Sequence, residues 1–303
     1  MKSNAIIRIV IWSIILIVLV GVLVAFLAEE RYLSDYTVAT SPLASEAAVP
    51  LEPVADATPV KVLPNKETLV VSGNSIDGIE IKWVAGDIII LPGDVAEITI
   101  SESDVTDKKY ELVWEVDERT LEISFCKERL ISGFGVNFGA NIQKDLYIYL
   151  PMDWNCRGLE IDAADATVEI RDMTIGNLDL DAASGTIRVE SCNIRKLDID
   201  TASGNVVFSG TLDTLDFDAA SANFTGEFHS TPSRIDMDSM SGNLDITLPE
   251  DCGYALSMEG MSKTFRSDFQ GTENRNGIHT YGDGRCRIKA DGMSCEVTIR
   301  KGQ

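Results

Sequence analysis

The chain has 303 residues and a formal net charge of −22, because 48 acidic side chains outnumber 26 basic ones. Its hydrophobic content of 45% is enough to bury a core, which excludes a wholly disordered chain. The acidity excludes nucleic acid as a partner, since few cationic side chains are available to neutralise phosphates. With only two histidines, His229 and His279, a histidine-based active site or metal site has little support.

An uncharged run from Ile9 to Ala28 predicts a membrane-spanning helix. Its 20 residues would extend for roughly 30 Å as an α-helix, the thickness of a hydrocarbon core. Because Lys2 and Arg8 are basic, residues 1–8 are expected in the cytoplasm and the rest of the chain outside. A cleaved signal peptide is the alternative, but the run is long for one and ends in a poor cleavage site. We therefore expect an uncleaved, single-pass anchor in the cell membrane.

Residues 29–66 predict a disordered stalk. The segment is rich in Ala, Ser, Thr and Pro, and it contains five of the nine prolines of the chain. Proline removes backbone donors and stiffens extended conformations, so neither a helix nor a sheet is expected here. The stalk would hold a folded domain, residues 67–303, away from the membrane surface.

A repeat organises this domain. Five clear copies of a twelve-residue unit start 18 to 20 residues apart, at Leu159, Leu178, Leu197, Leu215 and Ile235. Weaker copies start at Ile79, Leu256 and Ile288. A fixed period of this length is typical of repeat architectures, in which each unit stacks on the next.

Each unit predicts two short strands joined by a tight turn. Positions one and three are apolar and positions two and four are mostly acidic, which is the alternation of a half-buried strand. Positions ten and twelve are again apolar. Position eight is glycine in four copies but alanine at Ala166 and Ala222, so the pattern does not require left-handed backbone there. The predicted fold is all-β, a single-stranded parallel β-solenoid with rungs of about 19 residues, irregular and capping over 67–158 and regular over 159–303.

The repeats resemble those of the bacterial putative-adhesin family of β-strand-repeat proteins, a domain of unknown function. The resemblance rests on the units LDLDAASGTIRV and LDIDTASGNVVF and on the later segments LPEDCGYALSMEGMSKTFRSDF and YGDGRCRIKADGMSCEVTIRK. It covers residues 67–301 and includes no catalytic signature. The resemblance implies a solenoid outside the membrane in a bacterial, Gram-positive cell envelope, and it implies no established activity.

The repeats predict two columns of carboxylates on the outer face, at positions two and four. Position two contributes Glu160, Asp179, Asp198, Asp216 and Asp236, and position four contributes Asp162, Asp181, Asp200, Asp218 and Asp238. Stacked ~5 Å apart, neighbouring carboxylates repel by roughly 1 kcal/mol in water. Solvation, salt, raised pKa values or hydrogen bonds from the turns would relieve this repulsion. The alternative is Ca²⁺, for which Asp181, Asp200 and Asp218 are the candidate ligands, although the Gly-rich nonapeptide of calcium-binding rolls is missing.

The remaining candidate groups are cysteines and tryptophans. None of the six cysteines has CxxC spacing, and a bridge between Cys286 and Cys295 is left open. Trp83, Trp114 and Trp154 are expected to fill the cap, the alternative being a sugar-binding platform. No GxSxG, HExxH or P-loop pattern occurs, and nearly equivalent carboxylates do not supply the two distinct pKa values that carboxylate catalysis needs. We therefore expect no enzyme, no catalytic residue and no cofactor.

The expected function is that of a non-enzymatic, membrane-anchored extracytoplasmic protein. Its rigid acidic solenoid would bind a cell-envelope component or a membrane protein partner, with a role in the envelope stress response. An adhesin or carbohydrate-binding surface protein is the first alternative. A polysaccharide-active β-helix enzyme, which would need a carboxylate pair in a groove, is the second.

Overall fold

The computed structural model describes residues 68–103, 105, 107–127 and 143–302. The chain separates after Pro64 into two units, and all of the described residues belong to the second, Asn65–Gln303. The predicted anchor at 9–28 and the predicted stalk at 29–66 lie outside the described residues. Within the part of the chain that the structure describes, no helix is long and apolar enough to cross a membrane.

The described residues are all-β and contain no α-helix; their only helical segments are two short 3-10 helices, η1 (Gly73–Ser75) and η2 (Lys108–Tyr110). The strands join in one 13-stranded sheet. They are β1 (Leu69–Val71), β2 (Gly78–Gly93), β3 (Ile98–Glu102), β4 (Val113–Asp117), β5 (Thr120–Ser124), β6 (Leu146–Pro151), β7 (Cys156–Arg171), β8 (Thr174–Phe228), β9 (Arg234–Leu248), β10 (Tyr254–Ser267), β11 (Thr272–Glu273), β12 (His279–Tyr281) and β13 (Cys286–Lys301).

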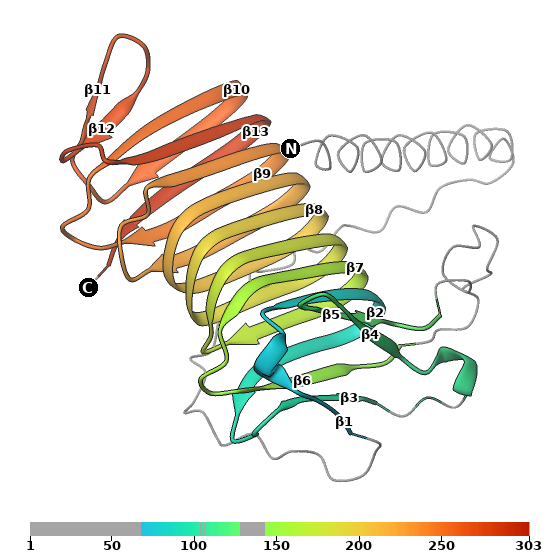
Figure 1. Ribbon diagram of the computed structural model, residues 1–303. Coiled ribbons are helices and arrows are strands. Elements are labelled where there is room, and N and C mark those ends of the chain that lie inside the picture. The colour runs from blue at the N-terminus through green and yellow to red at the C-terminus, as the bar shows by residue number, and fades with distance from the viewer. Residues whose placement is uncertain (1–67, 104, 106, 128–142, 303) are drawn as a thin grey trace, which may run out of the picture. The chain divides into compact units, whose positions relative to one another are not determined.

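The long strands pair in parallel and in the register that the repeat predicts. Position one of β2, Ile79, lies opposite Leu159 of β7, which in turn lies opposite Leu178 of β8. At the other end of β8, Leu215 lies opposite Ile235 of β9. The 55 residues of β8 run through successive rungs without a break, so the sheet coils on itself as a solenoid (Figure 1).

The order of the rungs in space departs from their order in the chain. The last strand, β13, is inserted between β9 and β10 and is parallel to both of them. Ile288 of β13 therefore lies opposite Ile235 on one side and Leu256 on the other. The antiparallel strand β12 then pairs with the first three residues of β10, Tyr254–Leu256, and β11 pairs with β12, so the start of this edge is covered.

Irregular strands close the opposite end of the solenoid. The first part of β2, Gly78–Lys82, pairs with β5, and its last part, Ile88–Gly93, pairs with β6. Beyond these, β4 pairs antiparallel with β5, while β3 and β1 extend the sheet from β6. The end of the sheet thus splits into two short antiparallel pieces, which agrees with the capping role predicted for this region.

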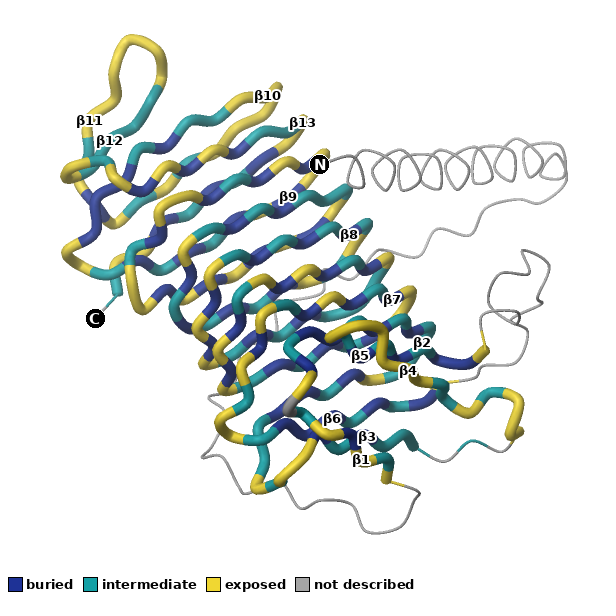
Figure 2. Tube along the Cα trace, in the orientation of Figure 1, coloured by how far each residue is buried: buried dark blue, intermediate teal, exposed yellow. Residues whose placement is uncertain are grey.

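Each rung consists of two strand segments joined by a turn, which we call its arms, and the core lies between the two arms. In the rung that starts at Leu178, the residues at positions one, three, ten and twelve are all buried, and the acidic residues between them face outward. Figure 2 shows the same alternation from rung to rung along the solenoid. Stacked rungs therefore place like residues in contact and form one continuous hydrophobic core.

Glycine is required at position eight in only some of the rungs. Gly86, Gly185 and Gly204 have φ of 110°, 129° and 140°, a region that residues with a β-carbon rarely adopt. Ala166 and Ala222 occupy the same position without a positive φ. The backbone at position eight therefore adopts two conformations, one with a positive φ and one without. This explains why the repeat has glycine at this position in some copies and alanine in others.

Candidate functional site

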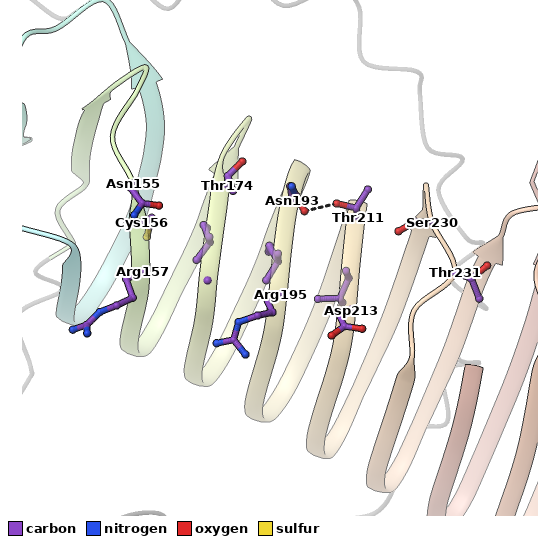
Figure 3. A pocket seen from close by; sticks show the side chains of 14 residues that line it. Asn155, Cys156, Arg157, Thr174, Asn193, Arg195, Thr211, Asp213, Ser230 and Thr231 are labelled. Atoms are coloured by element: carbon purple, nitrogen blue, oxygen red, sulfur yellow. Dashed lines mark hydrogen bonds between the residues drawn. The ribbon is translucent and has the colours of Figure 1, made fainter. Parts of the chain in front are cut away.

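A polar trough runs across successive rungs. Its lining residues come just before position one of each repeat. It has a volume of about 580 Å³. Figure 3 shows its lining side chains coming from equivalent places on neighbouring turns of the coil. The lining comprises Asn155, Cys156, Arg157, Thr174, Ile175, Gly176, Asn193, Ile194, Arg195, Thr211, Leu212, Asp213, Ser230 and Thr231.

One row of the trough presents an amide or a hydroxyl on every rung. The row consists of Asn155, Thr174, Asn193, Thr211 and Ser230, which are 18 or 19 residues apart in the chain. The Thr211 hydroxyl donates a hydrogen bond to Asn193 Oδ1 at 2.6 Å, which links two adjacent rungs. Since side chains alternate along a strand, the residues that follow them, such as Ile175 and Ile194, point inward and are buried. The polar row is thus supported by the hydrophobic core.

The second row of the trough carries charge. Arg157 and Arg195 are exposed on the first and third rungs, and Asp213 lies on the fourth. The rung between the arginines contributes Gly176, which has no side chain and leaves the trough open there. Arg157 lies 3.4 Å from Asp77, and Arg195 donates a hydrogen bond to Asn177. Both guanidinium groups are therefore oriented by a neighbour.

The one thiol on the trough, Cys156, is not a nucleophile at neutral pH. Burial raises its pKa to about 12, and the nearby Asp77 carboxylate adds to the shift. Burial likewise raises the pKa of Cys192, on the next rung but one, to about 11. A protonated, buried thiol is inert. The trough therefore offers hydrogen-bonding and charged groups for binding and no activated cysteine.

The structure places the acidic residues of the repeats in two columns on the outer face, as the sequence predicts. Glu160 lies opposite Asp179 at position two, and Asp162 lies opposite Asp181 at position four. Further along, Asp218 of β8 lies opposite Asp238 of β9. Basic residues join the columns and form ion pairs along the same arm of the rung: Lys82 with Glu80, Lys196 with Asp198, Arg234 with Asp236, and Lys289 with Asp291.

Repulsion within the columns is relieved partly by protonation. Burial raises the pKa of Asp181 to about 7, and the carboxylates of Asp200 and Asp179 add to the shift. Burial also raises the pKa of Asp179 to about 6, with Asp198 as the next cause. One oxygen of Asp181, Oδ1, is buried without a hydrogen-bond partner. Charging this carboxyl therefore costs stability.

We expect replacement of Asp181 by Asn to stabilise the fold at pH 8 and to have no effect at pH 4. The folded pKa of about 7 lies above the ordinary 3.8, so the destabilising charge appears as the pH rises between these values. The gain at pH 8 should be about 1–2 kcal/mol, because partial contact of this carboxylate with water weakens the repulsion. Urea denaturation at both pH values measures it. Glu227→Gln, exposed on β8, controls for the loss of one negative charge. If Asp181→Asn stabilised the fold equally at pH 4, the raised pKa of Asp181 would not be the cause of the gain.

The calcium hypothesis for Asp181, Asp200 and Asp218 stays a prediction. Within the described ranges, no group of three or more His, Cys, Asp or Glu side chains is placed so that it could hold a metal ion. The Ser184 hydroxyl, in the turn after Asp181, donates a hydrogen bond to Asp165 Oδ1 of the adjacent turn at 3.2 Å.

The cysteines and tryptophans belong to the core and the cap. All six cysteines are free and buried, so the bridge between Cys286 and Cys295 that the sequence left open is not formed. These two residues lie in different halves of β13, opposite Tyr254 and Lys263 of β10. The Trp83 ring is buried 5.0 Å from the Phe125 ring.

Trp154 is half-buried and donates to the Ile76 carbonyl at 3.1 Å, whereas Trp114 is exposed. A sugar-binding platform would need exposed rings, and Trp83 is buried. The capping role that we predicted is confirmed for Trp83 and Trp154, whereas Trp114, for which we predicted the same role, is 41% exposed.

The polar trough was not predicted from the sequence, because its Asn, Thr and Ser side chains are not typical catalytic or metal-binding residues. Its signal was nevertheless present, since Asn155, Thr174, Asn193 and Thr211 each stand four residues before position one of a repeat. A search for catalytic and metal-binding residue types passes over such a row. A search for any polar residue that recurs with the period would have found it.

The fold is that of a β-solenoid repeat protein with a polar trough across its rungs. The chain belongs to the Toastrack DUF4097 family, whose model matches residues 76–300. This match confirms the resemblance drawn from the repeats. No curated protein matches the chain at a significant level.

The chain also matches solved structures from several bacteria. A "putative adhesin" from Bacteroides fragilis is 15% identical, with a TM-score of 0.42, over 80% of this chain and 100% of the other. A "putative cell adhesion protein" from Clostridium sporogenes is 14% identical, with a TM-score of 0.34, over 78% and 98%. A "putative adhesin" from Parabacteroides distasonis is 14% identical, with a TM-score of 0.35, over 78% and 95%.

Proposed function

We propose that the protein is an adhesin-like surface protein that holds an uncharged glycan of a cell envelope in the polar trough. The observation that carries the proposal is the recurrence of an amide or a hydroxyl on five successive rungs. Rungs ~4.8 Å apart offer the same contact repeatedly along a line, which suits a linear polymer with a short repeating unit.

The chemistry of the trough favours sugar hydroxyls as its ligands. Amide and hydroxyl side chains both donate and accept hydrogen bonds, as sugar hydroxyls do. The fixed guanidinium groups of Arg157 and Arg195 add planar donors. A net charge of −22 repels polyanions, which favours an uncharged chain over an acidic one.

We propose binding without turnover. Glycoside hydrolysis commonly uses two carboxyl groups on opposite sides of the scissile bond. Among the lining residues, Asp213 supplies the one carboxylate, and Cys156 is held protonated. The arrangement therefore supports recognition and offers no acid–base pair.

The acidic columns support a second candidate function, the binding of a cationic partner in an envelope stress response. The stacking of carboxylates on neighbouring rungs favours it, because a cationic partner would relieve their mutual repulsion. Attachment to the cell membrane through residues 9–28, with the solenoid outside, belongs to both proposals.

Removing two groups of the trough should weaken glycan binding by about tenfold, since each lost hydrogen bond contributes about 0.5–1.5 kcal/mol. The test compares the full chain with the variant Asn193→Ala/Thr211→Ala by affinity electrophoresis in gels that contain neutral glucans, mannans or N-acetylglucosamine oligomers.

Thr225→Ala, exposed elsewhere on β8, is the matched control and should be retarded like the unaltered chain. Equal retardation of the double variant, or no retardation of the unaltered chain by any of these polymers, would exclude the trough as the binding site for uncharged glycans.

A further inference from the structure

Three methionines stand exposed on adjacent rungs at one end of the solenoid. Met240, Met293 and Met261 are 47%, 58% and 88% exposed. All three occupy position six of the repeat, at the outer corner of the rung. We name them the methionine row. Single exposed apolar side chains are common, but a contiguous group of them can mark an interaction site.

The row is assembled by the inserted C-terminal strand. Met240 belongs to β9 and Met261 to β10, and β13 lies between these strands. The flanking pairs fix the register, because Ser294 of β13 lies opposite Ser241 on one side and Ser262 on the other. Met293 therefore lies between Met240 and Met261, with ~4.8 Å from each rung to the next. The sequence separates these residues, and the fold places them side by side.

The change to methionine is confined to these three rungs. On the rungs closer to the N-terminus, position six is valine or alanine: Val84, Ala164, Ala183, Ala202 and Ala220. The corner thus accepts a small side chain, and its geometry does not require methionine. The choice of one residue type on three neighbouring rungs therefore points to the thioether itself.

We propose that the methionine row binds one soft monovalent cation, of the class of Cu(I). Thioether sulfur is a soft donor that selects Cu(I) over hard cations. The methionine side chain is unbranched and has three rotatable bonds, so sulfurs on three adjacent rungs can converge on one ion. Met293, in the middle, would be the central ligand.

Each methionine of the row follows a position-four carboxylate by two residues, namely Asp238, Glu259 and Asp291. Lys263, two residues after Met261, donates through Nζ to the Met258 carbonyl at 2.9 Å. Cys295 follows Met293 by two residues but is buried, and burial raises the pKa of its thiol. The three thioethers are therefore the exposed sulfur donors at this corner, and a site formed by them is distinct from the polar trough.

Silver ion, a redox-inert probe of the same softness, tests the site. The full chain is titrated with Ag⁺ by calorimetry, and native mass spectrometry gives the stoichiometry. We expect one ion per chain, and about tenfold weaker binding after Met293→Leu, which keeps an apolar side chain of similar volume but removes the sulfur. X-ray absorption of the Cu(I) form should show scattering from sulfur ligands.

Two matched variants separate the alternatives. Met152→Leu alters a methionine that is 77% exposed on a different part of the chain, and it should not change the affinity. Cys295→Ser should also leave binding unchanged. Unaltered Ag⁺ affinity in Met293→Leu would show that the row is an apolar surface and would overturn the proposal. Loss of binding in Cys295→Ser, or no binding by the unaltered chain, would overturn it as well.

Discussion

Replacement of Lys144 by methionine is expected to lower the free energy of unfolding by about 3–5 kcal/mol, which is the cost of leaving a buried partner charge unpaired. The Lys144 side chain is 1% exposed and forms an ion pair with Glu102. Its ammonium group also donates to the carbonyls of Tyr110, at 2.6 Å, and Phe125, at 2.5 Å. All three donor protons are thus used within the cap.

The surroundings of Lys144 explain the size of the effect. Its ammonium group lies 4.8 Å from the centroid of the Trp83 ring and 4.4 Å from that of the Phe125 ring. The Trp83 indole in turn donates to the Lys144 carbonyl at 3.0 Å. The residue therefore connects β2, β3, η2 and the ends of β5 and β6, so its loss loosens the whole N-terminal cap.

Urea denaturation followed by tryptophan fluorescence measures this effect, because Trp83 and Trp154 lie in the cap. Lys82→Met is the matched control, since Lys82 pairs with Glu80 at 2.6 Å near the surface and should change stability by less than about 1 kcal/mol. Lys144→Met/Glu102→Leu should recover part of the loss, because no charge is then left unpaired. A Lys144→Met effect no larger than that of the control would contradict the buried-network interpretation.

The parts of the fold that depend on local pattern were predictable from the sequence. Alternation of apolar and acidic residues specifies which face of a strand is buried, and a one-residue slip would bury the carboxylates. For this reason Ile79, Leu159 and Leu178 stand opposite one another as the repeat predicts. The two acidic columns follow from the same register.

The parts that depend on distant segments were not predictable. The copies that start at Leu256 and Ile288 match the repeat equally loosely, and nothing in the period tells which of them lies next to β9. In the structure β13 pairs with β9, and β10 is the terminal rung, with β12 paired to its first three residues. The methionine row could not be predicted for this reason.

Lys144 was missed for a related reason. It stands in the irregular cap, where no repeat relates it to other residues, and its partner Glu102 is 42 residues away in the chain. A lysine just before a strand is usually an exposed side chain. Only the convergence of several segments around it makes it a buried one.

Replacement of Gly185 by alanine is expected to destabilise the fold by about 2–5 kcal/mol, from backbone strain and from steric overlap. Gly185 has a φ of 129°, and a β-carbon built there would overlap the backbone oxygen of Ala166 on the preceding rung. Gly158→Ala is the matched control, because its β-carbon would meet no atom within 4 Å. It should change the stability by less than about 1 kcal/mol.

The two variants, compared by thermal and urea unfolding, also test whether the corner can change conformation. Ala166 shows that position eight tolerates a β-carbon where the backbone does not have a positive φ. Gly204, on the next rung, also has a positive φ, and a β-carbon there would overlap the Gly185 oxygen. A change of backbone conformation at Gly185 would therefore have to move the Gly185 oxygen and disturb the following rung. If Gly185→Ala is as stable as Gly158→Ala, the corners switch independently, and coupling between neighbouring rungs at this position is excluded.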